Sequence, residues 1–249
     1  MLYQAHRGVC TECPENTLPA FRKAQEQGYR VLEMDPRFTA DGVCVLHHDP
    51  TVNRTCRTAD GKMLEQETPI DSLTFAQLRQ LDAGLWFSEA FRGTKVPTLE
   101  EALTLAKAHN THVKLDNIFA RFPKEQIDTL FAVVERSGAW VGFTCADLQT
   151  VEMVVARFPN ADIHYDGPVT EEAIVRVKAA LKDNPLVVWI PADCPGTAWC
   201  RNPKATPELC AMIHKYAKLG IWIISTPEDL AQAQALGADI IETPGQLKP

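Results

Sequence analysis

Short runs typical of β-strands alternate with amphipathic helical stretches along the whole chain, and this alternation constrains the fold most strongly. A strand that returns parallel to its predecessor needs a crossover long enough to hold a helix, so the pattern favours a parallel sheet covered by helices. The candidate strands span 2–5, 30–35, 43–48, 111–116, 140–144, 161–165, 186–190, 220–225 and 238–242. The candidate helices span 15–27, 98–109, 123–137, 146–157, 170–182, 206–219 and 227–236.

The length of the chain fits one barrel built from such units. A (β/α)₈ barrel typically needs about 250 residues, and the chain has 249. No linker rich in proline, glycine or serine is long enough to divide it. We therefore expect residues 1–249 to form a single α/β domain, a distorted (β/α)₈ barrel. Four glycines stand where helices should end: Gly28, Gly138, Gly220 and Gly237.

Two stretches interrupt the alternation. Residues 36–42 are too few for a helical crossover, and Thr39-Ala40-Asp41-Gly42 is a turn signal, so a hairpin is expected there. Residues 50–96 are polar and rich in turn signals, which predicts a small inserted segment or cap after the third strand, over one end of the barrel. Nine candidate strands for eight positions also mean that one of them lies outside the barrel.

Composition excludes several classes of protein. The 25 basic and 32 acidic side chains give a net charge of −7, which disfavours a nucleic-acid partner. No apolar run approaches the 18 residues of a membrane span, and no secretory signal is visible, so we expect a cytoplasmic protein. The eight cysteines are irregularly spaced. Cys10 and Cys13 form a CxxC pattern that we interpret as two incidental thiols, with a reversible disulfide as the alternative.

Polar residues that can carry chemistry gather at the ends of the first strands. His6-Arg7-Gly8 closes the first strand, and His48-Asp49 closes the extended run that follows the predicted hairpin turn. Glu33 and Asp35 lie two apart on one strand, so their side chains share a face, about 6–7 Å apart along it. A turn near residues 40–42 pairs positions whose numbers add to about 82. Asp35 then falls opposite His47 and Glu33 opposite Asp49, which brings both carboxylates beside His48.

This set of residues suits metal-assisted cleavage of a phosphodiester. Two carboxylates on one face fit a hard divalent cation such as Mg²⁺ or Ca²⁺. Two histidines beside that cation, His6 and His48, can act as general base and general acid near neutral pH. Arg7 offers a planar fork for phosphate oxygens.

The same motifs, in this order and spacing, resemble those of the glycerophosphodiester phosphodiesterase family. They are His6-Arg7-Gly8, Pro14-Glu15-Asn16-Thr17, Ala20-Phe21, Gly28, Glu33-x-Asp35, Thr39-x-Asp41-Gly42 and His48-Asp49, with Asp82-Ala-Gly-x-Trp86-Phe87 and Val96-Pro97-x-Leu99 further on. The resemblance implies a TIM-type barrel, a divalent metal ion, and hydrolysis of glycerol-phosphate diesters to glycerol phosphate and an alcohol. It assigns His6 as base and His48 as acid. Sphingomyelinase D and lysophospholipase D enzymes share this layout.

Three positions depart from the family pattern. The family usually carries Glu-x-Lys at the end of its fourth strand, where this chain has Lys114-Leu115-Asp116 in reversed order. We expect Asp116 to complete the metal site with Glu33 and Asp35, and Lys114 to contact phosphate. Late in the chain, Ser225-Thr226-Pro227-Glu228 and Glu242-Thr243 replace family motifs. Two alternatives therefore stay open: a phosphodiesterase acting on a lysophospholipid or a sugar-phosphate diester, and an inactive ligand-binding barrel.

Further residues are candidates for substrate binding or for packing. Glu15 and Asn16 can cap the following helix, orient His6 or contact substrate, and Trp86 and Phe87 are candidate walls for the substrate. The remaining histidines are expected to be structural or on the surface: His47, His109, His112, His164 and His214. The remaining tryptophans are expected to serve packing: Trp189, Trp199 and Trp222.

Overall fold

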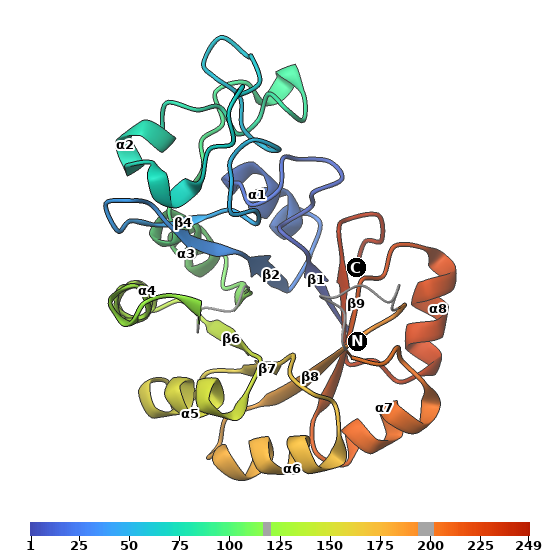
Figure 1. The fold of residues 1–249 in the computed structure, drawn as a ribbon. Helices are drawn as coiled ribbons and strands as arrows, with labels where there is room; N and C mark the ends of the chain where they lie inside the picture. Colours follow the sequence, from blue (N-terminus) through green and yellow to red (C-terminus); the bar gives the residue numbers. More distant parts are fainter. Residues whose placement is uncertain (117–120, 194–201) are drawn as a thin grey trace.

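Eight parallel strands close into a barrel in the computed structural model, which describes residues 1–116, 121–193 and 202–249 (Figure 1). The barrel order is β1-β10-β9-β8-β7-β6-β5-β2. The strands are β1 (Leu2–Ala5), β2 (Val31–Met34), β5 (His112–Leu115), β6 (Val141–Cys145), β7 (Ile163–Tyr165), β8 (Leu186–Pro191), β9 (Lys218–Trp222) and β10 (Ile240–Thr243). The predicted (β/α)₈ barrel is confirmed.

Helices follow most strands and lie outside the barrel (Figure 1). They are α1 (Leu18–Glu26), α3 (Leu99–Ala108), α4 (Lys124–Ser137), α5 (Leu148–Arg157), α6 (Glu171–Ala180), α7 (Pro207–His214) and α8 (Pro227–Ala235). Side chains at Thr98, Thr206 and Thr226 accept a backbone N–H in the first turn of α3, α7 and α8, which explains where these helices begin. No helix among the described ranges is both long and apolar enough to cross a bilayer.

The predicted hairpin forms, and it lies outside the barrel. Strands β3 (Pro36–Phe38) and β4 (Cys44–Leu46) pair antiparallel, with Pro36 opposite Leu46 and Phe38 opposite Cys44. This is the register predicted from the turn. The candidate strand at 43–48 is therefore the one that the barrel excludes, so residues 111–116 supply its third strand rather than its fourth. The hairpin and the segment after it accordingly follow the second barrel strand.

The segment at 50–96 has its own small apolar core. It contains only short elements: η1 (Ile70–Ser72), α2 (Phe75–Leu78) and η2 (Glu89–Phe91). Its buried cluster joins Val45 of β4 to Val52, Cys56, Ile70, Leu78, Ala83 and Val96. Figure 1 shows the segment at the upper left, beside α1 and α3 and apart from the ring of helices α4 to α8.

The sequence prediction was wrong where α7 ends and β9 begins. Helix α7 stops at His214, and Gly220 lies inside β9 instead of ending a helix at 219. A Cβ atom at Gly220 would lie 2.5 Å from the Trp189 ring, so the glycine marks a close approach of the ring to the strand. Gly28, Gly138 and Gly237 do follow helices, each with the positive φ typical of a helix end.

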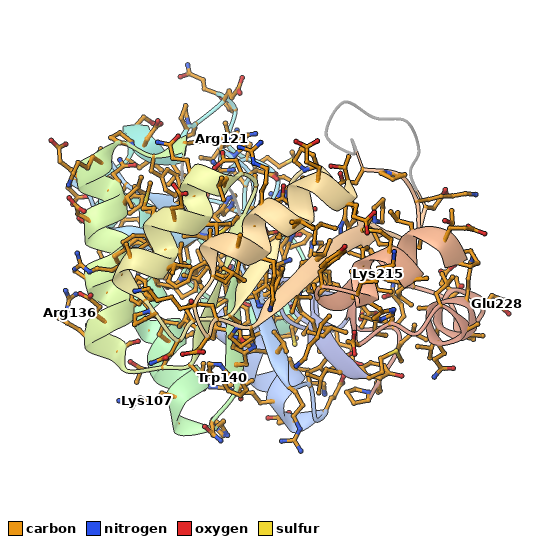
Figure 2. All side chains as sticks on the ribbon, turned by 90° about the horizontal axis from the view of Figure 1, so that it is seen from below. Lys107, Arg121, Arg136, Trp140, Lys215 and Glu228 are labelled. Atoms are coloured by element: carbon orange, nitrogen blue, oxygen red, sulfur yellow. The ribbon has the colours of Figure 1, made fainter. Side chains whose placement is uncertain are left out.

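Figure 2 shows the molecule from below, with the described side chains drawn on the ribbon. The main apolar core includes large buried side chains from strands and helices, among them Phe21, Leu32, Leu103 and Phe143. The labelled charged side chains of Lys107, Arg136 and Glu228 lie at the edge of the molecule in this view. The packed interior leaves the carboxyl ends of the strands as the place for a cavity.

Candidate active site

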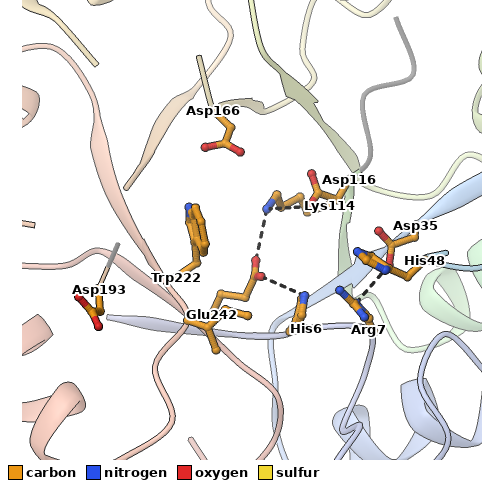
Figure 3. Close-up of a pocket in the computed structure, with 11 residues that line it drawn as sticks. His6, Arg7, Asp35, His48, Lys114, Asp116, Asp166, Asp193, Trp222 and Glu242 are labelled. Carbon is orange, nitrogen blue, oxygen red and sulfur yellow. Dashed lines mark hydrogen bonds and ion pairs between the residues drawn. The ribbon is translucent and has the colours of Figure 1, made fainter. Parts of the chain in front are cut away.

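A cavity of about 730 Å³ opens at the carboxyl ends of the barrel strands (Figure 3). His6 follows β1, Asp35 follows β2, and Asp116 follows β5, so loops and strand ends from several parts of the barrel contribute to one wall. The lining residues are His6, Arg7, Asp35, His48, Lys114, Asp116, Asp166, Asp193, Trp222, Ile223 and Glu242. The structure therefore brings together six of the predicted site residues in one cavity, with Glu33 buried directly beside them.

Three carboxylates meet at one point of this site. Glu33, Asp35 and Asp116 each offer an oxygen, and these oxygens all lie within 4.8 Å of one another. Burial raises the pKa of Glu33 well above its ordinary value, and the neighbouring Asp35 raises it further. Glu33 Oε1 is buried and has no hydrogen-bond partner among the described residues. Three carboxylates thus offer oxygen ligands at one place, and one of these buried oxygens lacks a hydrogen-bond partner among the described residues. Such a group of ligands fits a hard divalent cation.

Unusual backbone at two positions holds the carboxylates in place. Arg7 and Asn16 both adopt positive φ, at 59° and 53°. The backbone N–H of Arg7 donates to Glu33 Oε2 over 2.7 Å, and the Asn16 side chain donates to Asp35 Oδ2 over the same distance. The Arg7 Nε lies 3.5 Å from Asp35 Oδ2 as well. Strained backbone of this type recurs at functional sites, where surrounding contacts maintain it.

His6 is neutral at neutral pH. Burial lowers its pKa to about 4, and the positive charge of Arg7 contributes in the same direction. Its Nε2 lies 3.8 Å from Glu242 Oε1, a contact that becomes an ion pair when the ring takes up a proton (Figure 3). The His6 ring can therefore accept a proton, and the carboxylate of Glu242 then stabilises the imidazolium that forms.

His48 is oriented by the residue that follows it. Its Nδ1 lies 2.8 Å from Asp49 Oδ1, so the carboxylate fixes the proton on Nδ1 and leaves Nε2 for chemistry. Arg54, from the inserted segment, donates to both Asp49 oxygens over 2.6 and 3.1 Å. It also donates to both oxygens of Glu15, over 2.7 and 2.8 Å. Glu15 in turn accepts from Arg7 over 3.0 Å, so one network of charges joins His48 to Arg7.

Lys114 lies between two carboxylates at the base of the cavity (Figure 3). Its Nζ is 3.3 Å from Glu242 Oε2 and 3.9 Å from Asp116 Oδ2. Burial alone would lower the pKa of this ammonium, but the charges of Asp116 and Glu242 outweigh it and raise the pKa. Gln4 donates to the same Glu242 oxygen. Glu242 thus contacts both Lys114 and His6. The sequence analysis noted Glu242 only as a departure from the family pattern and did not predict this role.

A signal for Glu242 did exist in the sequence. It is a charged residue directly after the apolar pair Ile240-Ile241, near the carboxyl end of the last candidate strand. In the structure that strand, β10, pairs with β1, which leads to His6. Asp166, Asp193 and Trp222 also line the cavity without having been predicted. Trp222 had been expected to serve packing only.

Several predicted residues lie elsewhere. Trp86 and Phe87 are not among the residues that line the cavity. Their rings pack edge to face on each other, with centroids 5.7 Å apart, and the Trp86 N–H donates to Ala83 O. Glu15 and Asn16 support Arg7 and Asp35 without lining the cavity themselves. Cys10 and Cys13 are free thiols. Trp199 and two of the eight cysteines, Cys194 and Cys200, fall outside the described residues.

The histidines that we expected to be structural or on the surface are either buried in the protein or exposed to solvent. His47 is buried, with Nδ1 2.9 Å from Asp49 O and Nε2 2.7 Å from Thr55 Oγ1. His112 and His164 are buried at the amino-terminal half of the barrel interior, while His109 and His214 are exposed.

Comparison with known proteins points to one family. Residues 6–184 match the sequence profile of the glycerophosphoryl diester phosphodiesterase family. The chain is 37% identical over 135 residues to mouse glycerophosphodiester phosphodiesterase 1, which covers 48% of this chain and 38% of the relative. It is 40% identical over 101 residues to a glycerophosphodiester phosphodiesterase of Caldanaerobacter subterraneus, covering 41% and 38%. The matched region thus spans less than two fifths of the length of these curated relatives.

Solved structures share the fold over nearly the whole chain. An Oleispira antarctica phosphodiesterase, solved in complex with the product sn-glycerol-3-phosphate, superimposes with a TM-score of 0.78 at 20% identity, covering 99% of this chain and 94% of that one. A glycerophosphoryl diester phosphodiesterase from Parabacteroides distasonis gives 0.73 at 24% identity, covering 98% and 82%.

Proposed function

The chain belongs to the glycerophosphoryl diester phosphodiesterase family, and we propose that it hydrolyses glycerophosphodiesters to glycerol phosphate and an alcohol. The observation that carries the proposal is the juxtaposition of the Glu33, Asp35 and Asp116 carboxylates with two histidines at one cavity. A cation site next to a proton acceptor and a proton donor is what cleavage of a phosphodiester requires.

Glu33, Asp35 and Asp116 would hold the divalent cation, for which Mg²⁺ and Ca²⁺ are the candidates. When bound, such a cation offsets the negative charge of the phosphate as a Lewis acid. Arg7 and Lys114 reach the same cavity and add positive charge that opposes the charge developing on phosphorus. The Lys114 ammonium group already lies beside Glu242 and Asp116 in the cavity, so its charge is in place before the reaction begins.

His6 and His48 divide the proton transfers between them. Neutral His6 removes the proton from the attacking hydroxyl, which belongs either to water or to the neighbouring hydroxyl of the glycerol moiety, and Glu242 stabilises the resulting imidazolium. His48 gives a proton from Nε2 to the leaving alkoxide while Asp49 holds Nδ1. One P–O bond forms and the P–O bond to the alcohol breaks. A cyclic phosphate formed by the glycerol hydroxyl would be opened by water in a second step.

A substrate panel tests this function. Glycerophosphocholine, glycerophosphoethanolamine, lysophosphatidylcholine and bis-p-nitrophenyl phosphate are incubated with Mg²⁺ or Ca²⁺, with and without EDTA. We expect turnover of the two glycerophosphodiesters that EDTA abolishes. Turnover confined to lysophosphatidylcholine or to the nitrophenyl diester would overturn the substrate assignment. Binding without turnover at every metal concentration would identify the chain as an inactive ligand-binding barrel.

We further propose that residues 1–249 act as one domain in the cytoplasm, with the segment at 50–96 as a cap. Arg54 supports the cap assignment. It belongs to this segment, and its guanidinium group donates hydrogen bonds to Asp49 and Glu15 beside the catalytic cavity. The buried thiols of Cys44, Cys56 and Cys145, whose pKa values burial raises, suit a reducing compartment. Fractionation of cells expressing the tagged protein tests the location.

A further inference from the structure

Trp189 lies in the centre of the barrel directly against Lys114, and we propose that it is a positioning residue for the Lys114 ammonium group. The inference rests on the proposed function. Lys114 Nζ lies 4.4 Å from the centroid of the Trp189 ring. The face of an indole ring carries negative electrostatic potential and attracts a cation placed over it, most strongly where water is excluded. Trp189 is fully buried and Lys114 nearly so, which meets that condition.

The two carboxylates beside Lys114 do not define its position alone. Asp116 lies two residues along the chain from Lys114, and Glu242 is on β10. Trp189 contributes a third contact from β8, which is separated from β5 in the barrel by β6 and β7. A lysine side chain has a flexible four-carbon stem, so a contact from a third strand restricts the position of its ammonium group further than the two ion pairs do.

The Trp189 ring is itself held by a buried histidine. Its Nε1–H donates to His164 Nδ1 over 3.0 Å. Because tryptophan can only donate, His164 must be neutral and must carry its proton on Nε2. Burial lowers the pKa of His164 well below its ordinary value, which agrees with a neutral ring. His164 Nε2 has no hydrogen-bond partner among the described residues.

Two glycines make room for this pair of rings. A Cβ atom at Gly142 of β6 would lie 2.7 Å from His164 Nε2, and one at Gly220 of β9 would lie 2.5 Å from the Trp189 ring. Glycine inside a strand weakens the sheet. Both strands nevertheless carry it where the rings press against the backbone. The rings therefore have little freedom to turn, and the face that Trp189 presents to Lys114 is fixed.

A double-mutant cycle separates positioning from simple packing. The variants are Trp189→Phe, which keeps a ring but loses the N–H, Trp189→Leu, which loses both, and Lys114→Met, which removes the charge. Turnover of glycerophosphocholine is measured at saturating Mg²⁺ both with Lys114 intact and in the Lys114→Met variant.

With Lys114 intact, we expect each Trp189 change to lower kcat by about 2- to 30-fold, with a larger loss for Leu than for Phe and little change in KM. In the Lys114→Met background the same changes should alter kcat by no more than about twofold. Equal losses in both backgrounds would overturn the proposal and leave Trp189 as a packing residue.

Substitution of a buried tryptophan can prevent folding, so a second measurement uses fluorinated tryptophan. Site-specific incorporation of mono-, di- and trifluorotryptophan at position 189 weakens the ring's negative face with almost no change of shape. We expect log kcat to fall with each added fluorine, and an unchanged kcat across the series would contradict the proposal.

Trp140 is the matched control for the fluorination experiment. It also donates its N–H, to Asp162 over 3.0 Å, and stacks on His112, yet it touches neither Lys114 nor the cavity. Fluorination there should leave kcat unchanged.

The outcome is distinguishable from failure of the proposed function. If the unmodified protein hydrolyses no diester with any metal, the function fails, and the same cycle is then measured on the affinity for sn-glycerol 3-phosphate by calorimetry. If the protein is active and the cycle shows no coupling between Trp189 and Lys114, only the positioning role fails.

Discussion

Asn16 and Asp35 hold each other through two hydrogen bonds: the Asn16 amide donates to Asp35 Oδ2 over 2.7 Å, and the Asp35 backbone N–H donates to Asn16 Oδ1 over 3.2 Å. This reciprocal pair joins the start of α1 to the end of β2 and orients one of the three carboxylates proposed to bind metal. The relationship depends on the backbone of Asn16, whose φ of 53° is one that asparagine and glycine tolerate better than other residues.

Removal of the Asn16 side chain should weaken metal binding. Partners of this kind around a metal ligand typically contribute about 10- to 100-fold in affinity. We expect Asn16→Gly and Asn16→Ala both to lose about that much affinity for Mg²⁺, measured by calorimetry and by the metal dependence of turnover. Asn16→Ala should also lower Tm more than Asn16→Gly, because alanine is strained at positive φ. Unchanged metal affinity in Asn16→Gly would show that Asp35 keeps its orientation without this partner.

The two histidines should be individually essential and jointly non-additive. His6→Ala or His48→Ala is expected to lower kcat by roughly 10²- to 10⁴-fold, the usual contribution of one acid-base group. The kcat of the double variant should be only slightly lower than that of the less active single variant, because both groups act in one reaction. Steady-state kinetics with His109→Ala as the exposed control tests this. Near-wild-type turnover in either single variant would remove that histidine from the mechanism.

Arg54 should matter more through its shape than through its charge. It forks onto Glu15 and Asp49 with four hydrogen bonds, which a lysine cannot reproduce. We expect Arg54→Lys and Arg54→Gln each to lower kcat by about tenfold, because Asp49 then orients His48 less well. Arg92→Lys is the control, since Arg92 forms a similar fork with Glu89 on the surface of the same segment. Full activity in Arg54→Lys would mean that a single positive charge is sufficient.

Sequence reasoning succeeded where a contact is local. The hairpin register followed from one turn signal, since antiparallel pairing is fixed once the turn is placed, and Asp35 and His47 indeed meet, with the His47 N–H donating to Asp35 O over 2.8 Å. Alternation of strands and helices was equally local, and it indicated the barrel.

Contacts that depend on closure of the barrel could not be predicted in this way. Glu242 meets His6 and Lys114 because β10 pairs with β1. The predicted barrel implied that its last strand pairs with its first, but it did not give the register that places Glu242 beside His6. Arg54 was overlooked because an arginine in a polar, turn-rich segment looks like any solvated side chain. Trp86 and Phe87 were proposed as a ligand wall because they are aromatic rings in an insertion, and the structure shows that they also pack edge to face on each other.

Stability should fall as the pH drops from about 6.5 to about 4, partly because of His47. Burial lowers the pKa of folded His47 from 6.5 to about 4. Between these values the unfolded chain binds a proton that the folded chain excludes, so the free energy of unfolding decreases, by about 3 kcal/mol once the pH is below both values. Above pH 6.5 both states are neutral at this residue, and the effect vanishes.

Urea unfolding of wild type and His47→Gln between pH 4 and 7.5, in EDTA, measures the contribution of His47. Glutamine retains a donor and an acceptor but does not titrate in this range. The wild-type free energy should decline more steeply than that of the variant over the interval. Parallel curves would show that His47 takes up its proton equally well in the folded protein. His6, whose pKa is lowered in the same direction, contributes to both curves and cancels in the comparison.

Asp116 should complete the metal site although the family usually has a glutamate on this strand. Its carboxylate lies with those of Glu33 and Asp35, within 4.8 Å, and it is less buried than they are. Asp116→Asn keeps the shape of the side chain but removes its charge, so affinity for Mg²⁺ or Ca²⁺ should fall at least tenfold while excess metal partly restores turnover. Lys114→Ala should behave differently, with a lower kcat that added metal does not restore, because the role proposed for Lys114 is to offset charge on the phosphate and not to bind the metal. Titration of turnover against metal concentration for both variants separates the two roles. An unchanged metal dependence in Asp116→Asn would mean that Glu33 and Asp35 bind the cation without a third carboxylate, and that water takes the remaining positions.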